Sequence, residues 1–382
     1  MKILFIGLNS YYTESLNYQD NAFCKVFIEK GYEVAFISNP EAYVNGVITY
    51  VGASESIVEN GVKLIRVDYK FDRLASKKLK IYKSIYRYID DFKPDIIYCH
   101  GTQYYNIYEV VKYKLNNLNV KVYADTHTAY KNAKISNWYS FFLYNIYYKK
   151  LYKHIEPYLE KYFYIGIDEK QFAIDIYKAK EELMEFLPLG GFPISDKEYE
   201  EDRIEIRQKL KLTENDILVV HSGKLDVGKN TLSLINTIES INENRLKLVI
   251  IGNIPNSNKE LKKKLDDNNN TNIIYIGWQS SNILLKYICA SDIYAQPGTA
   301  SVTFNNAICC QTPIMSYEHD FYSPFFGIKS ICWIKSEEDI KNVLLEICNS
   351  NQKLIQLKKE AKANKDILDY RVLLDNAIGF CI

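Results

Sequence analysis

The fold of this chain is decided by residues 221–230, which read His-Ser-Gly-Lys-Leu-Asp-Val-Gly-Lys-Asn. Here an apolar strand ends in a glycine, and two lysines lie close to it. The apolar runs at 248–253 and 273–278 also end in or near a glycine. Open parallel sheets present phosphate-bearing ligands at such strand ends. The three runs therefore predict an α/β sheet with an anion site at one edge.

The first half of the chain alternates apolar strands with helices. The expected strands are 2–7, 32–38, 63–67, 95–100, 120–125, 161–167 and 185–191. The expected helices are 21–30, 76–91, 107–116, 138–160 and 169–179. Short apolar strands separated by longer helices predict a parallel sheet that is covered on both faces.

The character of the sequence changes at 192–213, which carries many charges and little apolar periodicity. We expect a hinge near 188–200, after which strands and helices alternate again. The chain should therefore hold two Rossmann-like, doubly wound α/β domains, 1–190 and 191–365, that face a ligand-binding cleft. A last helix, within 366–382, is expected to return to the first domain.

Composition narrows the class of protein. The 48 Lys and Arg residues nearly balance the 47 Asp and Glu residues, so nothing global indicates nucleic-acid binding. The eight cysteines form no Cys-x-x-Cys pair, which fits a reducing cytoplasmic compartment. We expect no signal peptide and no membrane span, because no uncharged run of 18 residues is present. A metal site is not expected, since neither an Asp-x-Asp motif nor a His–carboxylate set is visible.

Several motifs share their order and spacing with a known family. They are Gly31-Tyr-Glu-Val34, Pro94-Asp-Ile-Ile-Tyr-Cys-His-Gly101, Ala124-Asp-Thr-His127, Leu187-Pro-Leu-Gly-Gly191 and Gly223-Lys-Leu225 with Lys229. Together they resemble the retaining family 4 of glycosyltransferases (glycosyl transferases group 1), which have the two-domain GT-B fold. The resemblance implies transfer of a sugar from a nucleotide-diphosphate donor, with a UDP-sugar as the first choice. It implies a glycan or lipid-linked acceptor and no cofactor or metal.

Two lysines match the family's cationic element, and we expect Lys224 and Lys229 to contact the donor pyrophosphate. A fixed cation beside the leaving oxygens lowers the barrier as negative charge develops on them. The alternative is that both are solvated surface lysines. Gly223, Gly252 and His221, which ends a strand before the glycine loop, are further candidates for donor contact.

Two histidines follow strands of the first half. His127 falls where the resemblance places an active-site histidine that donates to a sugar hydroxyl; it could equally be a hydrogen-bonded histidine at a strand end. His100 is expected to be structural or a secondary cleft residue. Gly7, Asn9 and Ser10, at the end of the first strand, should face the cleft.

The sequence departs from the resembling family where two glutamates normally stand eight residues apart. A loop occupies the first position, and the second falls on Asn306, which would contact ribose through weaker neutral hydrogen bonds. The family's following glycine falls on Gln311. Because of this departure, the resemblance does not identify the base or the sugar of the donor.

The loop that replaces the first glutamate contains Pro297, Gly298, Thr299, Ala300 and Ser301. Its backbone N–H groups and hydroxyls precede an expected helix, so it can form an anion cradle. The plainer interpretation is a Pro-Gly turn with Ser301 as the helix N-cap. The two interpretations are compatible.

Aromatic residues and lysines alternate in 77–88 and 130–164. Such helices suit a membrane interface, where each lysine adds about 1 kcal/mol against an anionic leaflet. The alternative is that these tyrosines belong to the core. Peripheral contact with the inner face of the cell membrane is therefore one hypothesis.

Taken together, the sequence predicts a transferase of the hexosyltransferase type for bacterial surface polysaccharide or glycoconjugate synthesis. Two rivals remain: a sugar-nucleotide epimerase, for which Asp125 and Glu318 could serve as acid and base, and a catalytically degenerate partner subunit. A dinucleotide oxidoreductase is disfavoured because no Gly-x-Gly-x-x-Gly motif follows Gly7.

Overall fold

The computed structural model describes residues 1–14, 18–44, 47–58, 61–135 and 137–379. The chain divides into two compact units. The first contains Met1–Pro188 and Leu374–Ile382, and the second contains Leu189–Leu373. The last helix therefore belongs to the first unit only from Leu374 onward, whereas residues 366–373 belong to the second.

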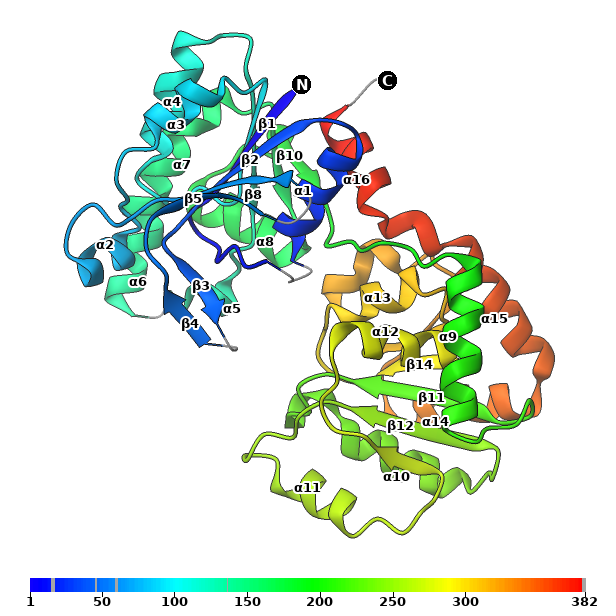
Figure 1. Cartoon of the computed structure of the whole chain (residues 1–382). Helices are drawn as coiled ribbons and strands as arrows, with labels where there is room; N and C mark the ends of the chain where they lie inside the picture. The colour runs from blue at the N-terminus through cyan, green and yellow to red at the C-terminus, as the bar shows by residue number, and fades with distance from the viewer. Residues whose placement is uncertain (15–17, 45–46, 59–60, 136, 380–382) are drawn as a thin grey trace. The chain divides into compact units, whose positions relative to one another are not determined.

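The first unit is built on an eight-stranded sheet of order β10-β9-β8-β7-β1-β2-β6-β5 (Figure 1). Its strands are β1 (Lys2–Gly7), β2 (Glu33–Ser38), β5 (Ser54–Ile57), β6 (Lys63–Arg66), β7 (Ile96–Cys99), β8 (Lys121–Thr126), β9 (Lys161–Tyr164) and β10 (Met184–Phe186). Its α-helices are α1 (Gln19–Glu29), α2 (Arg73–Leu79), α3 (Tyr86–Phe92), α4 (Ile107–Asn116), α5 (Tyr130–Ala133), α6 (Trp138–Phe142), α7 (Lys149–Ile155), α8 (Ile167–Phe172) and α16 (Tyr370–Ile378). Helix α16 starts in the second unit and ends in the first.

Seven of these strands run parallel and confirm the expected sheet, while β5 pairs antiparallel with β6. A separate antiparallel hairpin, β3 (Glu41–Val44) with β4 (Val47–Tyr50), was not expected from the sequence. Every residue of β4 and β5 is exposed, so neither strand contributes to the apolar core.

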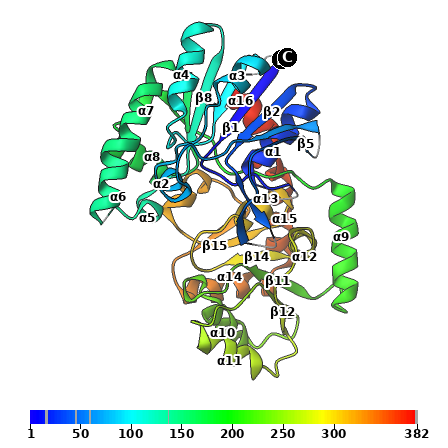
Figure 2. The same ribbon diagram turned by 60° about the vertical axis from the view of Figure 1, so that its left-hand side comes forward.

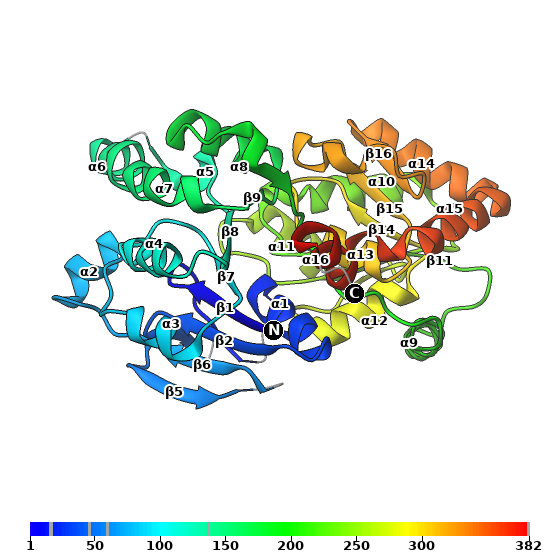
Figure 3. The same ribbon diagram turned by 90° about the horizontal axis from the view of Figure 1, so that it is seen from above.

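The second unit is a six-stranded parallel sheet of order β13-β12-β11-β14-β15-β16. Its strands are β11 (Ile217–Ser222), β12 (Leu246–Ile251), β13 (Ile273–Tyr275), β14 (Ile293–Gln296), β15 (Ile314–Tyr317) and β16 (Ile331–Ile334). Its α-helices are α9 (Asp196–Lys209), α10 (Thr231–Ile241), α11 (Lys259–Asp266), α12 (Ser281–Ala290), α13 (Thr303–Cys309), α14 (Glu337–Asn349) and α15 (Asn351–Ala363). Helix α10 packs with α14 on one face of the sheet and α9 with α12 on the other (Figure 3). This is the expected doubly wound arrangement.

Two helices differ from the sequence prediction. The charged segment where we expected a hinge forms α9, because Ser195 caps it by accepting a hydrogen bond from the Glu198 N–H and its Glu, Lys and Arg residues favour helix. Arg203 and Arg207 of α9 bind the buried carboxylate of Asp292. The single helix expected at 76–91 is split into α2 and α3, with Lys80 in the left-handed conformation (φ 51°) after α2.

The end of the chain is fastened to the first unit, as Figures 1 and 2 both show for α16 beside α1. Leu374 and Ile378 of α16 are buried. Lys30 pairs with Asp375, and the Tyr123 hydroxyl donates to the Ile378 carbonyl. The first unit is therefore built from both ends of the sequence.

The described cysteines are all free thiols, and Cys381 lies outside the described residues. Among the residues that the structure describes, no helix has both the length and the apolar character needed to cross a membrane.

Candidate functional site

The first part of the candidate site lies at the carboxyl edge of the first sheet. Strands β1, β7 and β8 are parallel neighbours, so the segments that follow them emerge at one edge. These segments carry the residues predicted from the sequence: Gly7, Asn9, Ser10, His100 and His127.

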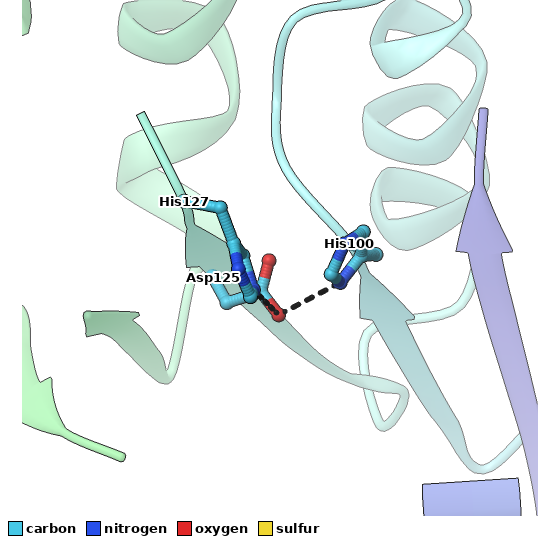
Figure 4. Close-up of side chains that lie close together, drawn as sticks. All are labelled: His100, Asp125 and His127. Atoms are coloured by element: carbon cyan, nitrogen blue, oxygen red, sulfur yellow. Dashed lines mark hydrogen bonds and ion pairs between the residues drawn. The ribbon is translucent and has the colours of Figure 1, made fainter. Parts of the chain in front are cut away.

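Asp125 of β8 is the centre of this edge (Figure 4). Its carboxylate is 1% exposed and accepts hydrogen bonds from the Tyr98 hydroxyl at 3.0 Å and the Gly101 N–H at 2.8 Å. The His100 Nδ1 lies 3.1 Å from Asp125 Oδ2, and the His127 Nε2 lies 3.4 Å from the same oxygen. Burial opposes ionisation, yet the two histidines hold the pKa of Asp125 well below its usual range.

His100 lies between two carboxylates, with its Nδ1 also 3.1 Å from Asp20 Oδ1. Burial by itself would lower the pKa of His100, but Asp125 and Asp20 outweigh it and raise that pKa to about 9. His100 is therefore protonated at neutral pH and neutralises part of the buried negative charge. This supports its expected structural role.

Asn9 and Ser10 hold the neighbouring segments together. The Asn9 amide donates to Gln103 Oε1 at 3.0 Å, and the Ser10 hydroxyl donates to Asp20 Oδ2 at 2.8 Å. Gln103 in turn donates to the hydroxyls of Thr128 and Tyr177. The loop after β1 is thus fixed against the loops after β7 and β8.

Several polar atoms in this unit are buried without a hydrogen bond among the described residues. They include Asn9 Oδ1, both amide atoms of Gln19, Asp20 Oδ1, His127 Nε2 and Glu169 Oε2. Burial raises the pKa of Glu169. Buried polar atoms of this kind are costly unless a ligand or water satisfies them.

Sequence reasoning missed Asp20 and Glu169. Both stand inside helices without a motif or a strand end to mark them, and only the fold brings Asp20 to His100.

Three residues at this edge could hold a metal ion by distance alone. Ligand atoms of His100, Asp125 and His127 lie within 4.8 Å of one another. However, both histidines direct a ring nitrogen at the same carboxylate oxygen. His100 hydrogen-bonds to it, and His127 Nε2 lies 3.4 Å from it without hydrogen-bond geometry, which is an ion-pair arrangement. The sequence prediction of no metal-ligand set missed this grouping.

The second part of the candidate site is the glycine-rich edge of the second sheet, after β11, β12 and β14. Gly252 has φ +139°, and a Cβ built on it would lie 1.8 Å from the Gly223 carbonyl oxygen. A Cβ on Gly298 would lie 2.1 Å from the Gly228 carbonyl oxygen. Only glycine permits these approaches, so the three loops are packed backbone against backbone.

Lys229 is 7% exposed and crosses from the loop after β11 to the loop after β14. Its ammonium donates to the Thr299 carbonyl at 2.9 Å and the Ala300 carbonyl at 3.2 Å. Lys224 is exposed. The two expected cations therefore differ: Lys229 is built into the loop structure, and Lys224 is open to solvent.

The loop 297–301 uses part of its own hydrogen-bonding capacity internally. The Thr299 N–H donates to the Gly228 carbonyl, and the Ser301 N–H donates to the Tyr322 hydroxyl at 2.9 Å. The expectation that Ser301 caps the next helix is wrong, because α13 begins at Thr303 with Val302 as N-cap. The Ser301 hydroxyl instead pairs with that of Thr303.

His221 is fully buried, and both of its ring nitrogens are occupied. Nδ1 lies 2.8 Å from the Ala295 carbonyl oxygen and Nε2 lies 2.9 Å from the Thr231 hydroxyl. Burial lowers the pKa of His221 to about 4, so the ring is neutral. This geometry favours a structural role over contact with a ligand.

Asn306 and Gln311, the two positions at which the sequence departs from the resembling family, have different surroundings. Asn306 is half-buried, and its side chain makes no hydrogen bond within the described part of the chain. Gln311 takes a left-handed conformation, φ 55°, which explains why a glycine would suit that position. Its amide donates to Asp196 Oδ1 at 2.9 Å.

The pair nominated for an epimerase is divided between the units. Asp125 belongs to the first unit, and Glu318 belongs to the second, where it pairs with Lys335. Neither unit by itself supplies both carboxylates.

The family comparison addresses the second unit. Residues 202–364 match the family model described as Glycosyl transferases group 1. This segment is therefore similar to the glycosyl transferases group 1 family. It includes Lys224, Lys229, loop 297–301 and Asn306, so the lysines and the glycine-rich edge lie inside the matched region. A search of curated proteins gives no significant match.

Solved structures extend the likeness to the full length of the chain. Anabaena HepE, crystallised with UDP and glucose, is 14% identical with a TM-score of 0.64, covering 99% of this chain and 98% of that one. WaaG, a glycosyltransferase of lipopolysaccharide biosynthesis, is 15% identical with a TM-score of 0.60 and 98% coverage of both chains. Sucrose-phosphate synthase from Thermosynechococcus elongatus is 12% identical with a TM-score of 0.64, covering 99% and 97%. At these identities the likeness establishes the fold, which is that of GT-B glycosyltransferases.

Proposed function

We propose that the protein is a retaining glycosyltransferase that moves a sugar from a UDP-sugar to a glycan or lipid-linked acceptor on the cytoplasmic side of the cell. The observation that carries the proposal is the match of residues 202–364 to the group 1 family model. The matched region includes Lys229 and the closely packed loops of Gly252 and Gly298. The likeness to HepE, crystallised with UDP, and to WaaG, involved in lipopolysaccharide biosynthesis, supports a UDP donor and a role in surface polysaccharide assembly.

The second unit binds the donor in this proposal. The buried Lys229 ammonium brings a fixed positive charge to loop 297–301, and the exposed Lys224 adds a second one nearby in sequence. Such preorganised charge stabilises a diphosphate as it leaves, because it requires no reorganisation during the reaction. Asn306, with an unoccupied amide among the described contacts, is the candidate for the ribose hydroxyls.

The reaction needs no nucleophile from the protein. The bond between the anomeric carbon and the diphosphate oxygen breaks, and its electron pair remains on the phosphate. The acceptor hydroxyl oxygen bonds to the anomeric carbon on the same face, and its proton passes to the departing phosphate. The protein stabilises the leaving charge and orients the sugar.

In the first unit, His127 is the residue proposed to orient the sugar. Its Nε2 faces Asp125, so Nδ1 is the nitrogen that would meet a sugar hydroxyl. A neutral ring would accept a hydrogen bond there, whereas a protonated ring would donate one. In this proposal the Asp125 carboxylate favours the neutral tautomer that carries its proton on Nε2.

Turnover assays with UDP-, GDP- and CMP-sugars test the proposal. We expect free UDP together with a glycosylated acceptor. An isomerised donor would indicate the epimerase instead, and no turnover with any donor would fit the degenerate subunit. Because the proposed reaction uses no metal, chelation by EDTA should leave the rate unchanged. A rate lost with EDTA and restored by Zn²⁺ would assign His100, Asp125 and His127 to a metal.

A thermal-shift assay with UDP isolates the donor site. A ligand at 100 times its dissociation constant should stabilise the fold by about 2.7 kcal/mol. We expect Lys224→Gln and Lys229→Gln to reduce the shift and Lys262→Gln, an exposed lysine of α11, to leave it intact. Lys229→Gln should also lower the melting temperature without ligand, since its ammonium ties two loops together. An undiminished shift in both variants contradicts the assignment.

A further inference from the structure

The helix 138–155 of the first unit presents an unusual surface. It runs without interruption through α6, the π-helical turn η2 (Leu143–Tyr148) and α7, about 27 Å in length. Trp138 is 82% exposed, Phe141 55%, Phe142 48% and Ile146 52%. We call these four residues the aromatic face.

The aromatic face is distinct from the core-facing side of the same helix. Leu143, Tyr148, Leu151 and Tyr152 are buried in the core of the first unit. Because that side is anchored, the helix cannot rotate to cover Trp138 and Phe142. Within 130–164 the structure thus separates core tyrosines from exposed aromatic residues.

The sequence segment that contains the aromatic face carries charge of one sign, and the Tyr130 hydroxyl at its start donates to the carboxylate of Asp175. Residues 126–155 contain five lysines and no aspartate or glutamate. Lys153 pairs with Glu156, which leaves Lys131, Lys134, Lys149 and Lys150. None of these four lies within ion-pair distance of a carboxylate in the described residues. Lys134 precedes Trp138 by four residues, and Lys150 follows Ile146 by four, so lysines stand at both ends of the aromatic face.

The segment 77–88 contributes less than its sequence suggests. Tyr82 and Ile85 are buried, and Lys77 is bound to Glu41 at 2.7 Å. Lys78 remains exposed, and the surface comprises the aromatic face with Lys131, Lys134, Lys149 and Lys150.

We propose that the aromatic face and its four lysines dock the first unit on an anionic membrane, with the helix lying in the plane of the interface. Exposed Trp and Phe with lysines on one helix combine apolar burial at the headgroup boundary with attraction to anionic lipid. A second protein fits less well, because lysines are depleted at protein–protein interfaces. The proposal does not depend on the glycosyltransferase assignment.

Co-sedimentation with lipid vesicles tests the docking surface directly. We expect the protein to bind vesicles that contain phosphatidylglycerol and not vesicles of phosphatidylcholine alone. Raising the salt from about 0.1 M to about 1 M should weaken binding, because the Debye length falls from about 10 Å to about 3 Å. Binding of equal strength to both vesicle types would overturn the electrostatic part of the proposal.

Matched variants locate the surface. Lys149→Gln with Lys150→Gln should weaken binding about 25-fold, since each lysine is worth roughly fivefold. Trp138→Ala with Phe142→Ala should weaken it by at least about tenfold. The controls are two exposed pairs of the same unit, Leu115→Ala with Leu118→Ala and Lys93→Gln with Lys121→Gln, which should bind like the parent.

Circular dichroism and thermal melting would show that the variants fold. Vesicle binding that survives both surface variants overturns the proposal. Analytical ultracentrifugation tests whether a second copy of the chain occupies the aromatic face instead. If the parent is a dimer that does not bind vesicles, and Trp138→Ala with Phe142→Ala makes it monomeric, the face is a dimer interface and the membrane proposal is overturned.

Discussion

The loops at the carboxyl edge of each sheet are held together by different interactions in the two units. In the first unit, loops are joined by side-chain charges: Asp125 and Asp20 around a protonated His100. In the second, loops are joined by backbone contact at Gly252 and Gly298, with one buried ammonium, Lys229, bound to carbonyls. The first edge therefore depends mainly on charge, whereas the loops of the second edge depend mainly on shape.

This difference predicts which perturbations each edge tolerates. A buried charge network fails when one partner is removed, because the remaining charges are left uncompensated. A close backbone approach fails when a single methyl group is added. The charge network around His100 should therefore respond most to the loss of a carboxylate, and the glycine loops of the second unit to the addition of a methyl group.

The largest effect is expected from Asp125→Asn. The amide keeps the shape but leaves His100 with one fewer counter-charge, so the first unit should lose about 3–5 kcal/mol at neutral pH. Hydrogen–deuterium exchange, resolved by peptide, should show the loss in the first unit and not in the second. The control Asp91→Asn removes an exposed ion pair with Arg87 and should cost less than about 1 kcal/mol. Equal effects of the two substitutions would contradict the network.

The second unit should respond most to Gly252→Ala. The added Cβ meets the Gly223 carbonyl, and φ +139° is strained for any other residue, so we expect a loss of about 3 kcal/mol or more in urea unfolding. Gly327→Ala is the matched control, because no atom lies within 4 Å of its Cβ and its φ is ordinary. If Gly252→Ala were as stable as Gly327→Ala, the close packing of the loops would be wrong.

The two buried histidines should give the units opposite responses to pH. His100 has a raised pKa of about 9, so its contribution is present below its unfolded pKa of about 6.5 and is lost as pH rises through 9. His221 has a lowered pKa of about 4, so its contribution is present above about 6.5 and is lost as pH falls toward 4. Each effect is at most about 3 kcal/mol.

Exchange rates measured by unit across this pH range would test the contrast. His221→Asn should remove the acid-side loss in the second unit only. A common pH profile for both units would contradict the assignment of the two rings.

The smallest changes in stability are expected at residues that adopt the left-handed backbone conformation just after a helix. Lys93 follows α3 with φ 54° and has an exposed side chain, so Lys93→Gly should stabilise the first unit by about 1 kcal/mol. Gln311 after α13 has φ 55° but also binds Asp196, so Gln311→Gly should be close to neutral. Thermal melts of the two variants measure the difference, and equal gains would show that the Asp196 hydrogen bond contributes nothing.

The sequence predicted the helices and strands whose apolar residues recur at regular spacing. Apolar runs ending in glycine identified β11 and β12, and the spacing of Ile107, Val110 and Val111 identified α4 at its observed bounds. It failed where local chemistry decides. The cap at Ser195 starts a highly charged helix, and the β3–β4 hairpin, whose second strand is fully exposed, was not expected.

The candidate site could be predicted only as far as strand ends allow. The order of motifs brought His100 and His127 to one edge, but Asp20 is far from them in the sequence and is found only through the fold. Similarly, Lys229 was expected at a solvent-facing anion site, while nothing in the sequence indicated that its ammonium binds the Thr299 and Ala300 carbonyls. Contacts between side chains from separate loops depend on packing that periodicity does not encode.

The return of α16 to the first unit has a consequence for how the protein is made. On the ribosome, residues 1–188 emerge before Leu374 and Ile378, which complete their packing. The nascent N-terminal half must wait with an uncovered apolar surface while the entire second unit is synthesised, and domains that fold as they emerge are most exposed to misassembly in such an interval. The first unit can therefore complete its core only after the second unit has been synthesised.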